Sequence, residues 1–153
     1  MPLTLGAVDL AADPDLAGDQ MEWVDEFDWD TITQSQERGL TGALLIQEGV
    51  KLHGRPITLQ SNGGAWFTLA TVRALEALRD QPGAVMQLVL PRGDQYWVTW
   101  NRENGSPLAA KQVIRSQDMA DTVYELTLRL ITVAAPPEPE PDPEPEPEPE
   151  PQP

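Results

Sequence analysis

Residues 54–78, GRPITLQSNGGAWFTLATVRALEAL, place a strand pattern, a glycine turn and a helix pattern in direct succession. Arg55–Gln60 alternates between apolar and polar side chains, which is typical of a short strand. Thr68 suits the N-cap of a helix, and apolar residues then recur at helical spacing. The residues on that apolar face are Leu69, Val72, Leu75 and Leu78. Because many phosphate-binding loops share this layout, the stretch predicts either a nucleotide site or a structural joint.

The residues around the glycines argue against the nucleotide site. A Walker loop needs a lysine and then a serine or threonine after its second glycine, and neither follows Gly64. The dinucleotide fingerprint needs three spaced glycines, whereas this stretch has Gly63 and Gly64 alone. Trp66 and Phe67 would crowd the start of the helix, where a phosphate must approach. We therefore expect Asn62–Gly64 to turn the chain so that the helix packs on a sheet.

The remaining periodicity predicts an antiparallel β domain around this helix. Alternating or apolar runs bounded by turn residues mark the other strands. Their expected positions are residues 29–36, 40–47, 84–90, 95–100 and 122–133, with one more short strand within 107–115. A turn is expected at residues 37–39, between the first two of these strands. The fold class is α+β, mainly β: an antiparallel β-sandwich or split barrel of six to seven strands with one flanking helix, plus a disordered acidic Pro-Glu C-terminal tail.

The longest expected strand has two unlike faces. Its apolar face contains Tyr124, Leu126, Leu128 and Leu130. Glu125, Thr127 and Arg129 alternate with these residues, so the opposite face is expected to meet water or another subunit.

Negative charge lies at the two ends of the chain. Residues 1–30 contain nine acids and no Lys or Arg, and residues 136–153 contain seven acids and again no base. Since the whole chain has 25 acids and 10 bases, the middle holds nine acids against ten bases. This distribution gives no basic surface for sequence-specific nucleic-acid binding. The expected organisation is an N-terminal acidic arm at 1–20 with one short strand within Leu3–Val8, a β domain at 21–135 and a Pro-Glu-rich tail at 136–153.

Motifs that would support chemistry are weak in this sequence. Glu26, Asp28, Asp30 and Glu37 match positions of a calcium loop, but Thr31 stands where that loop needs glycine. The chain has no cysteine and a single histidine, His53, which argues against common zinc sites and catalytic dyads. Arg92-Gly93-Asp94 matches an adhesion tripeptide but lies where a turn is expected. Four serines, Ser35, Ser61, Ser106 and Ser116, lack a nucleophile-elbow pattern. We expect no enzyme activity, cofactor or metal.

Residues 21–133 resemble the small tail and baseplate ring proteins of long-tailed bacteriophages, the tail-tube-like and distal-tail family. The resemblance lies in EWVDEFDWDTITQSQERGLTGALLIQ, GRPITLQ, the helix led by a tryptophan, PGAVMQLVLPRGDQYWVTW and YELTLRLITV. It implies a β-sandwich or split barrel flanked by one helix. It also implies rings, commonly hexameric, around the channel through which DNA leaves the particle. The acidic N-terminal arm and the Pro-Glu tail lie outside this pattern.

The expected function is a structural virion protein that forms a ring around the DNA channel at the distal tail or baseplate. Expected partners are further copies of the chain, neighbouring tail tube proteins and baseplate or hub proteins. DNA would pass through the lumen without specific binding, and no membrane is involved because no apolar run reaches membrane-spanning length. The protein would be synthesised in the host cytoplasm and reside in the virion. One alternative is the major tail tube protein. A second, of another class, is a soluble binding module that recruits a basic partner through the Pro-Glu tail.

Aromatic residues mark the expected subunit interface. The candidates are Trp23, Phe27, Trp29, Trp66 and Phe67, because large aromatic side chains often anchor protein interfaces. We also expect the acids of residues 13–30 to line the ring channel, where they would repel DNA and keep it sliding.

Overall fold

The computed structural model describes residues 2–114 and 122–139. Its strands form a larger sheet in the order β2-β1-β8-β9-β11-β6-β3, with β10 and β7 also paired to β11, and a separate β4–β5 pair. The strands are β1 (Thr4–Leu5), β2 (Val8–Asp9), β3 (Glu22–Trp23), β4 (Ile32–Arg38), β5 (Leu44–Val50), β6 (Pro56–Gln60), β7 (Phe67–Thr68), β8 (Met86–Val89), β9 (Gln95–Trp100), β10 (Leu108–Gln112) and β11 (Val123–Thr132). Two short 3-10 helices span Pro14–Leu16 and Gly18–Gln20, and α1 spans Leu69–Arg79.

The fold class expected from the sequence is confirmed. All strand pairs are antiparallel, and one α-helix accompanies the sheet. Among the described residues, seven strands have four residues or more: β4, β5, β6, β8, β9, β10 and β11. The path of the larger sheet is open, with β2 and β3 at its two ends, so the strands described form no closed barrel.

The long strand β11 lies at the centre of the larger sheet. Its residue Leu128 pairs with Leu108 of β10 and with Leu59 of β6, which places those two strands on opposite edges. Strands β9 and β7 extend the same two edges toward the ends of β11. Leu126, Leu128 and Leu130 are buried, as the alternation in the sequence predicts. The opposite face of β11 is only half-buried.

The stretch at residues 61–79 folds as a turn followed by a helix. Gly64 N donates a hydrogen bond to Ser61 O at 2.8 Å, and the two residues between them, Asn62 and Gly63, have φ of 44° and 77°. Positive φ at both central positions is the geometry of a tight reversing turn, which Asn-Gly adopts readily. Thr68 Oγ1 then accepts a hydrogen bond from Thr71 N and caps α1. The structural joint expected from the sequence is confirmed.

Residues 1–20 do not form the acidic arm expected from the sequence. Strand β1 pairs with β8, and Leu3, Leu5 and Leu10 are buried in the hydrophobic core. Gly18 is buried against the backbone of Leu10, where a β-carbon would lie 1.8 Å from Leu10 O. Asp9, Asp13 and Asp15 are exposed, while Leu3 and Leu5 before them and Leu10 between Asp9 and Asp13 complete the core. The short strand expected within Leu3–Val8 corresponds to β1 and the start of β2, but the pairing of β1 with β8 joins residues too far apart for local patterns to reveal it.

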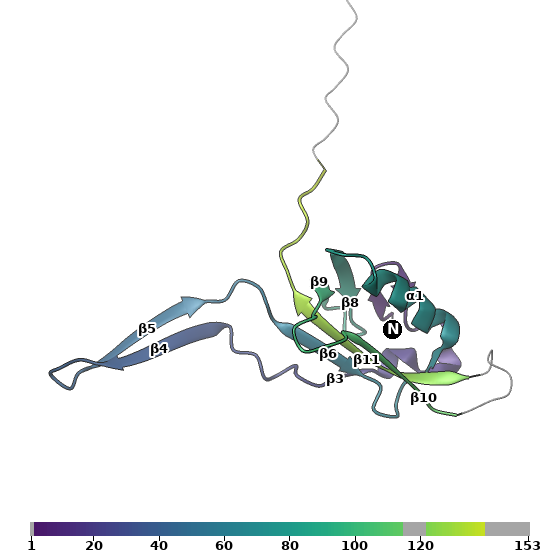
Figure 1. The fold of residues 1–153 in the computed structure, drawn as a ribbon, viewed down its shortest axis with the longest axis horizontal. Coiled ribbons are helices and arrows are strands. Elements are labelled where there is room, and N and C mark those ends of the chain that lie inside the picture. The colour runs from purple at the N-terminus through teal and green to yellow at the C-terminus, as the bar shows by residue number, and fades with distance from the viewer. Residues whose placement is uncertain (1, 115–121, 140–153) are drawn as a thin grey trace, which may run out of the picture.

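The β4–β5 hairpin was expected within the β domain, but it projects from it (Figure 1). Every residue of both strands is exposed. The strands turn at Gly39–Ala43 rather than at residues 37–39, because β4 continues through Arg38. The two strands pair in full register from Ile32↔Val50 to Arg38↔Leu44. The hairpin predicted from the sequence therefore exists, but it adds nothing to the core.

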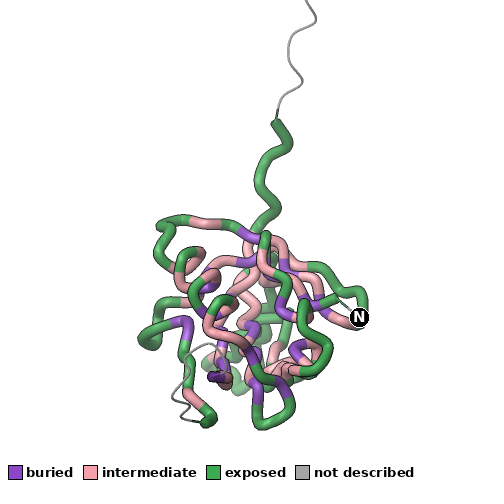
Figure 2. Tube along the Cα trace, turned by 90° about the vertical axis from the view of Figure 1, so that its right-hand side faces the viewer, coloured by how far each residue is buried: buried purple, intermediate pink, exposed green. Residues whose placement is uncertain are grey.

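The C-terminal segment leaves the body after β11. Figure 2 shows residues 134–139 as an exposed, irregular segment that leads away from the buried residues of the body. The remainder of the expected Pro-Glu tail, residues 140–153, lies outside the described residues.

Replacing Leu128 with alanine should destabilise the protein strongly. Leu128 is fully buried at the centre of β11, and Leu→Ala at such sites lowers the free energy of unfolding by about 2–5 kcal/mol. Thr127→Ala, on the half-buried face of the same strand, should cost less than about 1 kcal/mol. Urea unfolding followed by tryptophan fluorescence measures both. Equal losses for the two variants would contradict the burial described for β11.

Candidate interaction surface

Exposed apolar side chains concentrate on the hairpin and its attachment to the body. The described residues include thirteen large hydrophobic residues that are exposed, and nine of these lie within residues 24–52. They are Val24, Phe27, Ile32, Leu40, Leu44, Leu45, Ile46, Val50 and Leu52. We call residues 31–51 the arm, and residues 24–30 and 52–55, which join it to the body, the neck. Exposed apolar surface of this extent typically marks an interaction site.

The two faces of the arm differ in composition. Directly opposed residues of an antiparallel pair share a face, so the register places Ile32, Val50, Ile46 and Leu44 together on one side. We call this side the apolar face. The other side holds Leu45 and otherwise small or polar residues, among them Thr33, Ser35, Gln47 and Gly49. The arm is therefore amphipathic across its thickness.

Polar residues on the apolar face bond to one another. Gln36 Nε2 donates to Gln34 Oε1, and Gln34 Nε2 donates to Glu48 Oε1, both at 2.6 Å. This chain of hydrogen bonds lies between the apolar pair Ile32–Val50 and the apolar residues near the tip. Since several polar groups of the face already have partners, the face can be buried at a reduced desolvation cost.

The neck is held by two cation–π contacts. Lys51 Nζ lies 4.5 Å from the ring centroid of Trp29 and donates to Asp30 O at 2.9 Å. Arg55 lies 4.5 Å from the ring centroid of Trp23 and donates to Glu26 O at 2.6 Å. Lys51, the last residue of the arm, thus contacts the first neck segment, and Arg55, in the second neck segment, contacts both the first neck segment and Trp23 of β3. Cation–π contacts at exposed sites contribute about 0.5–1 kcal/mol each.

The aromatic residues expected at the subunit interface lie in three kinds of environment. Trp23 and Trp29 are half-buried in the neck contacts described above. Phe27, also in the neck, is 89% exposed. Trp66 is exposed beside the start of α1, whereas Phe67 is buried in the core. Phe67 is paired with Tyr124 of β11, and its side chain is buried. A buried ring cannot make a surface contact.

The acids of residues 13–30 lie on more than one side of the molecule. Asp25 accepts hydrogen bonds from Thr58 N and Oγ1, and Thr58 pairs with Arg129 on the polar face of β11. Asp13 instead lies in a groove beside α1, with Trp66 and Thr71. Since α1 packs on the buried face of β11, these two acids are on opposite sides of the sheet. A single channel would be lined by part of this group, not by all of it.

The calcium-loop acids are likewise dispersed. Glu26 pairs with Arg92, while Asp30 Oδ1 accepts a hydrogen bond from Ile32 N. Within residues 2–114 and 122–139, no three His, Cys, Asp or Glu side chains are grouped so that they could hold a metal ion. Glu26 also fixes the Arg-Gly-Asp turn: its hydrogen bond with Arg92 raises the pKa of that guanidinium above its usual value. His53 is exposed in the neck, beside Gly54.

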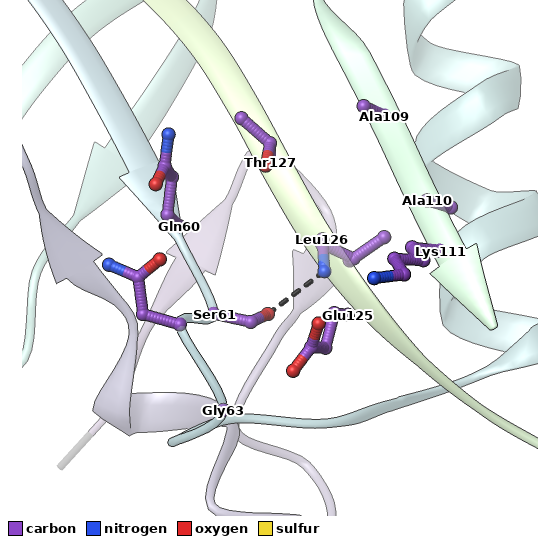
Figure 3. Close-up of a pocket in the computed structure, with 10 residues that line it drawn as sticks. Gln60, Ser61, Gly63, Ala109, Ala110, Lys111, Glu125, Leu126 and Thr127 are labelled. Carbon is purple, nitrogen blue, oxygen red and sulfur yellow. Dashed lines mark hydrogen bonds between the residues drawn. The ribbon is translucent and has the colours of Figure 1, made fainter. Parts of the chain in front are cut away.

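A polar hollow of about 240 Å³ lies where β6, β10 and β11 meet (Figure 3). Its lining includes Gln60, Ser61, Lys111, Glu125 and Thr127. Ser61 Oγ accepts a hydrogen bond from Leu126 N at 2.9 Å, which ties the end of β6 to β11. The lining contains no histidine to act as a base toward this serine. The hollow belongs to the half-buried face of the sheet that the alternation in β11 predicts.

Comparisons with protein-family models, with curated proteins and with solved structures found no match for this chain. In the part of the chain that the structure describes, no helix is long and apolar enough to cross a membrane. The arm and neck are the surface that the geometry singles out. Sequence reasoning found the hairpin but missed its projection, because a strand pattern alone does not say whether its neighbours cover it.

Removing the charge of Lys51 should loosen the neck. Lys51→Met keeps the aliphatic stem but loses both the contact with Trp29 and the bond to Asp30 O. We expect several-fold faster hydrogen–deuterium exchange of backbone amides in residues 28–32 and 50–53. Lys51→Arg retains a cation over the ring and should exchange nearly as slowly as the original chain. Identical exchange in the two variants would show that the cation does not stabilise the neck.

Proposed function

We propose that this protein is a structural component of a bacteriophage tail and forms a ring around the DNA channel at the distal tail or baseplate. The observation that supports it most directly is the arm, whose fourteen strand residues are all exposed. A two-stranded hairpin alone is marginally stable in water, and its outer edges carry unpaired backbone groups. Ring assembly would cover both the edges and the apolar face.

The resemblance of residues 21–133 to small tail ring proteins supplies the class of assembly. The mainly β fold with one flanking helix agrees with that class, although folds of this kind serve many functions. By this proposal the ring is a hexamer in contact with tail tube and baseplate or hub proteins, and DNA passes through its lumen without specific binding. The protein then acts without catalysis or cofactor and resides in the virion.

The major tail tube protein remains the second candidate within this class. Both candidates assemble into rings, so the arm is compatible with either. Copy number separates them: a tube protein is among the most abundant proteins of a purified particle, whereas a distal ring protein is present in one or a few rings. Quantitative protein staining of purified particles would decide between the two.

Disrupting the apolar face should abolish ring formation without unfolding the body. Electron microscopy of the purified full chain should show rings with a central hole. The double variant Leu44→Ser/Ile46→Ser should sediment as a monomer, because it removes apolar side chains from the surface that a neighbour covers. Its free energy of unfolding should change by less than about 1 kcal/mol, since both residues are exposed.

The matched control is Ser35→Ala/Gln47→Ala, on the opposite face of the arm, which should still assemble. A monodisperse monomer of the original chain at all accessible concentrations would refute the proposed function. If the Leu44→Ser/Ile46→Ser variant still assembles, the apolar face is not part of the interface.

Deleting residues 136–153 distinguishes the ring protein from a binding module that uses the Pro-Glu tail. The deletion removes seven acids and no base. A ring protein should still assemble, and electron microscopy of the truncated chain should show the same rings. A module that recruits a basic partner should lose its binding, measured by titration with polylysine, and should show no ring before or after the deletion.

A further inference from the structure

The tip of the arm presents one leucine without cover. Leu40 is fully exposed in the turn between β4 and β5. The turn is closed by Gly39 N donating to Ala43 O and by Gly42 N donating to Gly39 O, both at 2.9 Å. Gly42 has φ of +82°, which favours glycine there. Arg38 lies beside this turn and donates to Gly42 O, so an apolar knob and a cation occupy the same end of the arm.

A groove of matching chemistry lies beside the start of α1. It has a volume of about 330 Å³, more than enough for one leucine side chain, and is lined mainly by apolar residues. Those residues are Leu10, Ala12, Pro14, Leu16, Trp66 and Phe67. Trp66 is 39% exposed there. The carboxylates of Asp9 and Asp13 also line the groove; each accepts one backbone hydrogen bond through Oδ1 and has a second oxygen for a cation.

The arm cannot place its tip in the groove of its own chain. The groove adjoins β7, which pairs with the first residues of β11, whereas the neck bonds to Thr132 at the last residue of β11. Ten strand residues separate these ends by about 30 Å. The arm also points away from α1 (Figure 1). Tip and groove are thus at opposite ends of one molecule.

We propose that the arm tip of one copy occupies the groove beside α1 of the next copy, with Leu40 against Trp66 and Arg38 paired with Asp9 or Asp13. The occupant is a second copy because the same chain supplies both halves of the contact and their charges are opposite. This inference rests on the proposed ring function and gives the contact that builds the ring. A contact between two different surface patches is head-to-tail, and such contacts generate closed rings or filaments.

Because the chain has no cysteine, a cross-linking test has no background. Full-length Leu40→Cys and full-length Ala12→Cys are prepared separately, mixed, and oxidised mildly. We expect a disulfide-linked dimer that forms at least tenfold faster than in two control mixtures. The first control replaces Leu40→Cys with Thr33→Cys, which is exposed elsewhere on the arm; the second replaces Ala12→Cys with Gln81→Cys, which is exposed after α1.

Sedimentation provides the second measurement. Leu40→Asp should weaken self-association at least tenfold, because it would bring a carboxylate against Asp9 and Asp13, whereas Leu40→Met should retain it. Leu40 is fully exposed, so neither variant should change folding.

Three outcomes overturn the inference. If the original chain assembles, but the Leu40–Ala12 cysteine pair links no faster than the controls, the tip lies elsewhere and the ring function stands. If Leu40→Asp assembles as well as the original chain, the tip again lies elsewhere and the ring function stands. If the original chain does not self-associate, the inference and the proposed ring function fail together.

Discussion

The structure depends on the pairing of β11, which holds four other strands at once. β9 and β10 follow one of its edges, and β6 and β7 follow the other. The leucines on its buried face meet Val72 and Leu75 of α1 in one core. A shift of β11 by one residue would turn its buried leucines to the opposite face of the sheet, away from α1. The positions of α1, the groove and the neck therefore follow from the register of this strand.

Different interactions maintain the body and the arm. In the body, burial of apolar surface offsets the entropy of ordering the chain. In the described residues of the arm, no such burial occurs, and the register of the hairpin and its side-chain hydrogen bonds maintain the strands. The neck then fixes the direction of the arm through Lys51 and Arg55. The described body thus buries its own core, whereas the arm projects from it with its strand residues exposed.

Much of the body could be predicted from the sequence, because its elements are locally encoded. The alternation at residues 122–133, the turn at Asn62–Gly64 and the cap at Thr68 each specify their own structure. The predictions that were wrong concern contacts between residues far apart in the sequence. Leu3 and Leu5 join the core because β1 pairs with the distant strand β8, and Phe67 is buried where β7 pairs with β11. To find the exposed arm and the groove beside α1, one must know which residues no neighbour covers, and periodicity does not provide this.

The separation of arm and core has a consequence for how such a sequence can change over generations. The fourteen strand residues of the arm are all exposed and lie outside the core. Under the proposed assembly, substitutions among them would be selected through the surface that the arm meets. Substitutions in β11 must satisfy four neighbouring strands at once. Under the proposed contact, the arm would diverge in step with the groove that receives it, while the core of the body would change less. Matched changes in arm and groove would then let copies of one sequence assemble with each other and not with copies of a diverged sequence.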